Sequence, residues 1–243
     1  MPLILSNVNN SGGFSLTGNS GRFSATSTSA ASIVTDGLLF LVDANDAASY
    51  GGSGTTWTDL AGTQDNITLV GSPTFTSGTP SYFTFNGSSQ YGTGTGNVVP
   101  AAAYSKCVWF YLNGTADNNL LSSAAGGHFM FFASTSKMYC GHANWPVYTA
   151  FESVTTFSNN QWYFAVLTFN TTDGMKLYIN GTLDNTYTAN KTQRGGNGTT
   201  NVATFGGGNL LNGRISKGMT YNKVLSQAEI TQNFNADKSK FGL

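Results

Sequence analysis

"QWYFAVLTFNTTDGMKLYINGTLDNTYT", residues 161–188, contains an apolar run followed by two runs in which apolar and polar residues alternate. Asp173-Gly174 and Asn180-Gly181 separate these runs. A period of two residues is that of a β-strand, and Asn-Gly suits a two-residue hairpin turn because both central residues need a positive φ. The stretch therefore predicts three consecutive antiparallel strands, with a polar face left for water or a partner.

The same pattern continues along most of the chain. Strands this short and frequent, separated by Gly-rich turns, predict an all-β fold, either an antiparallel sandwich or a barrel. A length of 243 residues suits one large domain of this class. The other apolar runs occupy residues 37–44, 67–76, 81–87, 106–114, 128–134, 137–143, 201–208 and 213–225.

Only the C-terminal end of the chain has the pattern of a helix. Ser226 followed by Glu229 is a capping box, and Leu225 is placed to pack against Ile230 across the first turn. Ile230 and Phe234 share one helix face at i, i+4 spacing. We expect one short amphipathic helix that packs on the sandwich by this face.

Charge is sparse and balanced in this sequence. Eleven Lys and Arg residues and eleven Asp and Glu residues are scattered singly, and charged residues make up 9% of the chain. A nucleic-acid-binding protein needs a basic patch, so this class is excluded. No run approaches the roughly 20 apolar residues of a membrane helix, and the N-terminus lacks a signal-peptide pattern. We therefore expect synthesis in a cytoplasm without membrane insertion.

Residues 1–32 differ from the rest of the chain. Their brief apolar pulses are separated by Gly, Ser, Asn and Thr, so they predict an arm rather than core. Two interpretations remain open. One is a disordered leader; the other is a strand-forming arm that orders on a neighbouring subunit, as the alternation in "GGFSLTG" allows.

Four stretches together resemble the laminin-G-like, concanavalin A-like jelly-roll family. They are "IVTDGLLFLVDANDAASYGGSGTTWTDLAG" (33–62), "FTFNGSSQYG" (83–92), the first 26 residues of the opening stretch (161–186) and "GRISKGMTYNKVLSQAEITQNFNA" (213–236). The versions in virion proteins of tailed phages, including marine, cyanophage-like phages, are the most similar. The resemblance runs from about Ile33 to the C-terminus.

This resemblance implies a two-sheet antiparallel jelly-roll sandwich with one short C-terminal helix, formed by residues 33–243. Family members serve as adhesion modules, glycan binders, structural domains and, in related jelly rolls, glycoside hydrolases. The fold alone does not fix an activity.

The acidic residues do not support hydrolysis. Retaining hydrolases of this type carry a Glu-x-Asp-x-x-Glu strand, and glycoside hydrolysis needs two carboxylates across the bond. The only glutamates are Glu152 and Glu229, and the capping box accounts for Glu229. The sequence also lacks the Gly-x-Ser-x-Gly motif. We therefore expect a protein that is not an enzyme.

The sequence offers two candidate metal sites, one for zinc and one for calcium. Cys140 and His142 share a strand face, and Cys107 and His128 could complete four zinc ligands. Packing explains such apolar strands better, and free, buried thiols are expected for both cysteines.

Calcium is the second candidate, because laminin-G-like domains often hold this ion at the rim. Asp43, Asn45 and Asp46 follow a strand directly and offer oxygen ligands. Their spacing is not that of an EF-hand, and such residues are ordinary turn formers. No cofactor is expected, with calcium as the open possibility.

The segment "HANWPVY" offers a carbohydrate-binding site. Trp145 precedes a proline that marks a loop or an edge, and Asn144 and Tyr148 flank it. Sugar faces stack on aromatic rings while their hydroxyls bond to planar polar groups. The competing interpretation is that Trp145 caps the sandwich edge.

The other three tryptophans are predicted to pack in the core. The resemblance places Trp57 and Trp162 at positions that the family uses for packing. Trp109 lies within the apolar run "CVWFYL".

The hypothesis that unites these features is a non-enzymatic phage virion surface protein. The arm would attach to capsid, tail or fibre proteins as a homo-oligomer, and the jelly roll would face outward as capsid decoration or a fibre-associated subunit. The alternative is a carbohydrate-binding adhesion module for host-surface glycans. A glycoside hydrolase relative without its catalytic carboxylates is a distant third.

Overall fold

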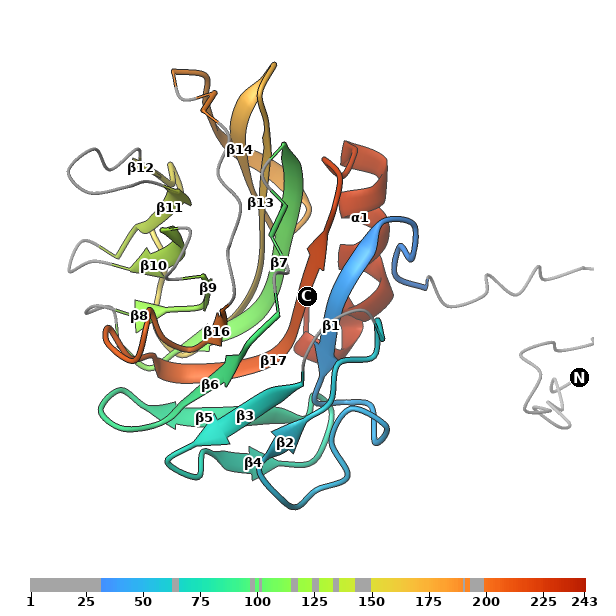
Figure 1. Cartoon of the computed structure of the whole chain (residues 1–243), viewed down its shortest axis with the longest axis vertical. Helices are drawn as coiled ribbons and strands as arrows, with labels where there is room; N and C mark the ends of the chain where they lie inside the picture. Colours follow the sequence, from blue (N-terminus) through green and yellow to red (C-terminus); the bar gives the residue numbers. More distant parts are fainter. Residues whose placement is uncertain are drawn as a thin grey trace, which may run out of the picture.

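The computed structural model confirms the all-β fold with its C-terminal helix (Figure 1). It describes residues 32–62, 66–96, 99–100, 102–114, 118–123, 127–132, 136–142, 150–189, 191–192 and 199–243. The predicted N-terminal arm lies outside the described residues and stays a prediction.

The described strands form three antiparallel sheets. The large sheet has the order β15-β14-β13-β7-β17-β5-β4, with β1 also paired to β17. The small sheet has the order β12-β11-β10-β8, and the third sheet the order β2-β3-β6-β16-β9. The strands are β1 Leu38–Asp43, β2 Thr56–Trp57, β3 Ile67–Val70, β4 Thr74–Thr76, β5 Tyr82–Asn86, β6 Tyr91–Gly94, β7 Ala103–Leu112, β8 Asn118–Asn119, β9 Leu121–Ser122, β10 His128–Phe132, β11 Met138–His142, β12 Ala150–Glu152, β13 Trp162–Asn170, β14 Gly174–Ile179, β15 Thr182–Tyr187, β16 Thr200–Val202 and β17 Asn212–Tyr221.

The opening stretch folds as the predicted meander of β13, β14 and β15. Asn180 and Gly181 have φ values of 50° and 81°, as the two-residue turn requires. The Asn180 backbone N–H donates to the Phe164 carbonyl, and its Oδ1 accepts from the Phe164 N–H. The turn is therefore fixed to the neighbouring strand as well as by its own geometry.

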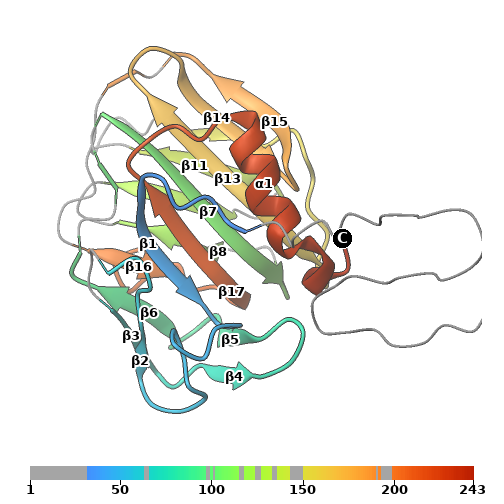
Figure 2. The ribbon, with the colours of Figure 1, turned by 90° about the vertical axis from the view of Figure 1, so that its right-hand side faces the viewer.

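The large sheet is buried on both of its faces over much of its area. Its inner face packs against the other two sheets, and residues such as Phe110, Leu167 and Ile215 form this main core. Its outer face carries α1 (Gln227–Asp237) and the short 3₁₀ helix η1 (Lys238–Phe241), as Figures 1 and 2 show. The expectation that the outer face of the meander meets water or a partner is therefore wrong for Phe164 and Val166 of β13 and for Tyr178 of β14, which are buried in a second core formed with the C-terminal helix.

The helix begins and packs as the sequence predicts. Ser226 caps it and forms the capping box with Glu229. Phe234 and Phe241 stack on the ring of Trp109 from the large sheet, with centroid distances of 5.7 and 4.0 Å. Leu225, Ile230 and Trp109 belong to this second core, which lies on the outer face of the large sheet.

None of the described helices is long and apolar enough to span a bilayer.

A buried group of charges ties the end of α1 to the sheet. The Lys217 ammonium pairs with Asp43 at 2.8 Å and also with Asp237, which in turn pairs with Lys240 at 2.7 Å. Burial alone would raise the pKa of Asp237, but Lys217 and Lys240 outweigh it and lower that pKa. Breaking a buried ion pair costs more than breaking an exposed one, because the remaining charge stays away from water.

Asp237→Asn is expected to lower the free energy of unfolding by about 3 kcal/mol at pH 7, measured by urea denaturation. Because the pKa of Asp237 is lowered in the folded chain, the wild type loses the stabilisation from this ion pair as the pH falls through that pKa. The difference in unfolding free energy between wild type and variant therefore shrinks in acid. The control is Asp36→Asn, which breaks a pair with Lys223 whose carboxylate side is 84% exposed; about 0–1 kcal/mol is expected there. Equal losses in the two variants would contradict the assignment.

Candidate functional site

The predicted carbohydrate site lies in the connection between β11 and β12. Asn144, Trp145 and Tyr148 are all outside the described residues. Their role stays a prediction.

A second aromatic group, which we call the outer strip, lies on the outer face of the large sheet. It consists of Tyr82, Tyr111, Trp162 and Arg214. Trp162 pairs with Tyr111 across β13 and β7, and Tyr111 pairs with Arg214 across β7 and β17. Because side chains alternate across a sheet, these residues lie on the face opposite the main core. All four side chains are half-buried.

The outer strip is a compact stack around one guanidinium group. The Arg214 Cζ atom lies 4.7 Å from the centroid of the Tyr82 ring and 4.3 Å from that of Tyr111. The Trp162 ring lies 5.6 and 5.5 Å from the same two rings. Cation–π contacts of this kind hold both the rings and the guanidinium in place.

Asparagine side chains continue the outer strip toward the ends of its strands. Asn212 precedes Arg214 by two residues on β17, so it is on the same face. Asn113 directly follows β7, and its backbone N–H donates to the Asn212 carbonyl at 3.0 Å. Both are exposed, and their side-chain amides form no hydrogen bond within the described part of the chain. Rings beside free amides are the combination that sugars require, because a sugar presents both an apolar face and hydroxyl groups.

The sequence reasoning missed the outer strip because it assigned Trp162 to the core. That prediction is confirmed for Trp57 and Trp109, which are fully buried, and in part for Trp162, which packs against the second core but is only half-buried. Trp162 does pack on Phe241, with 4.9 Å between the ring centroids, yet it stays partly exposed. No local signal in the apolar run marks Trp162 as partly exposed, because its exposure depends on how far the C-terminal helices extend over the sheet.

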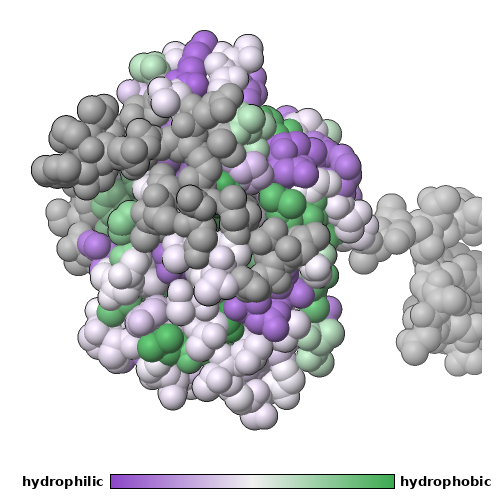
Figure 3. All heavy atoms as spheres, in the orientation of Figure 1, coloured by the Kyte–Doolittle hydropathy of each residue, from purple (hydrophilic) through white to green (hydrophobic). Residues whose placement is uncertain are grey.

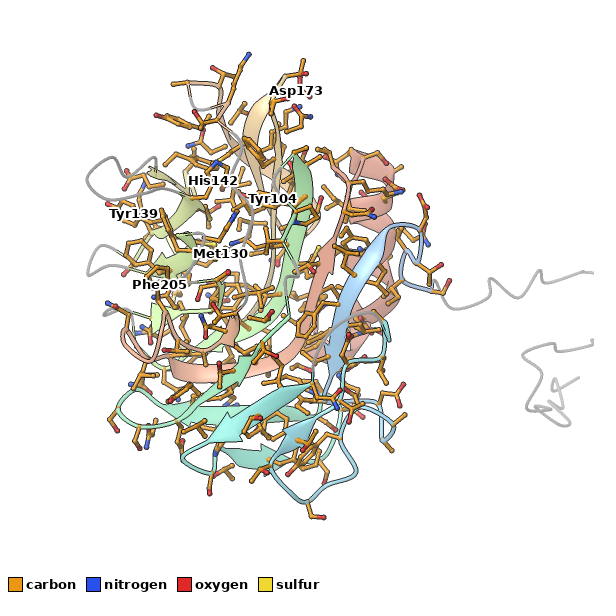
Figure 4. The ribbon with its side chains drawn as sticks, in the orientation of Figure 1. Tyr104, Met130, Tyr139, His142, Asp173 and Phe205 are labelled. Carbon is orange, nitrogen blue, oxygen red and sulfur yellow. The ribbon has the colours of Figure 1, made fainter. Side chains whose placement is uncertain are left out.

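A polar group lies inside the sandwich between β7, β10 and β11. The His142 Nε2 atom lies 2.9 Å from the Thr192 carbonyl, which can only accept, so Nε2 carries the proton. Nδ1 then accepts from the Tyr104 hydroxyl at 2.8 Å. The His128 ring packs edge-on against both rings, and Figure 4 shows Tyr104 and His142 facing each other between the sheets.

The interior group does not form the zinc site considered from the sequence. Cys140 and His142 do share the inner face, with His128 opposite on β10. Cys107, however, belongs to the second core on the other face of the large sheet. The described residues hold no group of three or more potential metal ligands. Both cysteines are free and buried, as predicted.

The calcium candidates do not fit a metal site. Asp43 is engaged by the Lys217 ammonium and accepts from the Asn45 backbone N–H at 2.9 Å. The Asn45 Oδ1 accepts from the Ser81 N–H, and Asp46 accepts from the Ala48 N–H. These oxygens fix a loop after β1, which is the ordinary turn chemistry that was the competing interpretation.

The two glutamates are far apart in the fold. Glu152 lies on β12 in the small sheet, with Lys137 3.9 Å away. Glu229 lies in α1 on the other side of the large sheet, where it completes the capping box (Figure 1). These two carboxylates cannot flank one glycosidic bond.

The surface seen in Figure 3 agrees with the low charge of the chain. Its coloured residues are mostly of intermediate hydropathy, with small separate groups of polar and apolar residues. The outer strip belongs instead to the face that carries α1, which Figure 2 turns toward the reader.

A family model described as the concanavalin A-like lectin/glucanases superfamily matches residues 85–231, more than half of the chain. The chain belongs to this superfamily. Its matched region includes Tyr111, Trp162 and Arg214 of the outer strip, whereas Tyr82 lies just before it. None of the curated protein sequences compared with the chain matches it.

Solved structures of similar fold include domains that bind other molecules. The binding domain of botulinum neurotoxin DC, in complex with SialylT, has a TM-score of 0.64 at 16% identity, covering 83% of this chain and 52% of its own. Domain 4 of the extracellular GH43 arabinanase AbnA from Geobacillus stearothermophilus, in complex with arabinotriose, has a TM-score of 0.63 at 14% identity, covering 81% of this chain and 97% of its own. The chain thus spans about half the length of the toxin domains, and the likeness concerns the fold.

Lys106 of β7 is also buried inside the sandwich, and it contacts no carboxylate of the described residues. Its Nζ atom lies 3.3 Å from the carbonyl oxygens of Leu121 and Phe129, which is long for a hydrogen bond. Burial lowers the pKa of Lys106 from 10.5 to about 7. Between these two values the unfolded chain binds the proton and the folded chain does not, so stability rises with pH across this window.

Lys106→Met is therefore expected to raise the free energy of unfolding, and by about 2 kcal/mol more at pH 6 than at pH 9. Urea denaturation at the two pH values measures the difference. Lys176→Met, which changes a half-buried lysine on β14, is the matched control and should show no such pH dependence. The same gain at both pH values for Lys106→Met would contradict the argued cost of burying this charge.

Proposed function

We propose that this chain is a non-catalytic carbohydrate-binding module whose ligand lies on the outer strip. The observation that carries the proposal is the packing of Trp162, Tyr82 and Tyr111 around Arg214 beside exposed asparagines. These rings are partly exposed and held by their neighbours, so little ordering is needed when a sugar stacks on them. The carbohydrate ligands named for structures of the same fold are consistent with this role.

The arrangement of four carboxylates favours binding over hydrolysis. Glu152 and Glu229 are separated, and Asp43 and Asp237 are engaged by Lys217. Asp43, Asp237 and Glu229 have structural roles. A module without a catalytic pair would hold a glycan without cleaving it.

Asn113→Ala combined with Asn212→Ala is expected to weaken glycan binding about tenfold, because several hydrogen bonds to sugar hydroxyls are lost. Isothermal titration with the best ligand from a glycan array measures the change. Neither side chain forms a hydrogen bond within the described residues, so the melting temperature should stay the same. Trp162→Ala should weaken binding by a similar factor through loss of the stacked ring.

Asn235→Ala is the control, because it removes an exposed asparagine from α1. Trp145→Ala tests the site predicted from the sequence in the same assay. If only Trp145→Ala weakens binding, the site is the β11–β12 connection and the outer strip is not the ligand surface. If the chain binds no glycan on the array, carbohydrate binding itself is wrong.

We further propose that the module is displayed on a phage virion, attached by residues 1–32 to capsid, tail or fibre proteins as a homo-oligomer. The resemblance to tailed-phage virion proteins and the low, balanced charge support this setting. Location at the virion surface, after synthesis in the host cytoplasm, follows from the same hypothesis. The sandwich begins close to the proposed boundary, since the Val34 N–H donates to Asn233 and its carbonyl accepts from the Tyr221 hydroxyl.

Deletion of residues 1–32 is expected to abolish attachment to the particle while leaving a folded domain. Co-sedimentation with particles that lack the protein measures attachment, and the melting temperature reports folding. A truncated chain that still attaches would rule out the arm as the attachment segment. Failure of the full-length chain to co-sediment with the particles would count against virion display.

A further inference from the structure

We propose that the outer strip selects acidic glycans, with Arg214 binding a sugar carboxylate. This inference rests on the proposed carbohydrate-binding function and names its ligand class. It starts from the state of Arg214, which forms no ion pair and no hydrogen bond within the described part of the chain. Its Nε atom is buried without a hydrogen-bond partner.

Two lysines of the fold, unlike Arg214, form ion pairs with carboxylates. Lys217 is shared between Asp43 and Asp237, and Lys223 between Asp36 and Glu229. A chain with so few charges therefore pairs these lysines within itself. Arg214 packs between the rings of Tyr82 and Tyr111 and pairs with no carboxylate of the described residues, so its positive charge is left for an external anion.

The two tyrosine rings prepare the guanidinium for a planar partner. With Tyr82 and Tyr111 within 4.7 and 4.3 Å of the Cζ atom, the group cannot sample the range of positions open to a surface arginine. A guanidinium binds a carboxylate through two parallel N–H···O bonds, and fixing it beforehand removes much of the entropy cost. The half-buried setting also weakens screening by salt.

The neighbouring residues suit a sugar that carries this carboxylate. Trp162 lies one ring away from the guanidinium, so a ligand can stack on the indole while its acidic group reaches Arg214. Asn212 and Thr84 flank Arg214 along and across the strands and carry no charge. Further along β17, Asp43 and Asp237 are already paired with Lys217.

The experiment compares acidic oligosaccharides with their neutral forms. The probes are oligomers of galacturonate, mannuronate and glucuronate and N-acetylneuraminate-terminated glycans, each beside the same compound after reduction of its carboxylates to alcohols. Full-length wild type is expected to bind at least one acidic probe about ten- to a hundredfold more tightly than its reduced form. Arg214→Gln should bring this ratio close to one while binding of the reduced form stays.

Two further variants separate charge from fold. Arg214→Lys keeps the charge but not the planar fork, so it should retain only part of the preference. Lys176→Gln removes a positive charge from the same face of β14, opposite Thr168 and at the far end of β13 from Trp162, and should leave the ratio unchanged. Melting temperatures identify any variant that fails to fold. If Arg214→Gln does not fold, the ratio of acidic to reduced binding measured for Arg214→Lys tests the proposal instead.

The outcomes distinguish this inference from the function on which it rests. Equal affinity of the wild type for acidic and reduced probes would overturn the role of Arg214 while leaving carbohydrate binding in place. No binding to either form would overturn both. A preference that persists in Arg214→Gln, or that appears only for sulfated glycans added to the panel, would overturn carboxylate recognition by Arg214.

Discussion

The pairing of β7 with both β13 and β17 is the constraint on which the rest of the structure depends. These three strands run side by side through the middle of the large sheet, and their common register decides which side chains face inward. Phe110, Tyr163 and Ile215 share one row on the inner face, and the main core forms over them. A shift of one residue in either pairing would exchange the two faces.

The same register creates the outer strip. Trp162, Tyr111 and Arg214 come from three separate parts of the chain, yet they form one row because their strands are paired in this way. The helix and its 3₁₀ extension then cover the neighbouring outer residues, among them Trp109, which Phe241 stacks upon. The binding surface that we propose lies where this cover stops, so its rings are both supported and accessible.

The two buried lysines show how the fold distributes its few charges. Lys217 is held by Asp43 and Asp237 and ties three elements together. Lys106 lies among apolar and neutral polar groups, and burial lowers its pKa to about 7. One lysine therefore supports the attachment of the C-terminal helix, whereas the other makes stability depend on pH. Arg214 differs from both, because it is only half-buried and its described neighbours leave its charge unpaired at the surface.

Local sequence determined the elements of this protein. The Asn180-Gly181 turn, the three-strand meander and the capping box of α1 follow from interactions between residues close in the chain, so their patterns could be recognised directly. Tertiary structure decided what these elements face. Trp162 appeared to belong to the core because its run is apolar, but exposure at a strand end depends on where the helix from another part of the chain stops. Likewise, no local signal brings Tyr82 to Arg214, because their contact depends on how β5 and β17, far apart in sequence, pair.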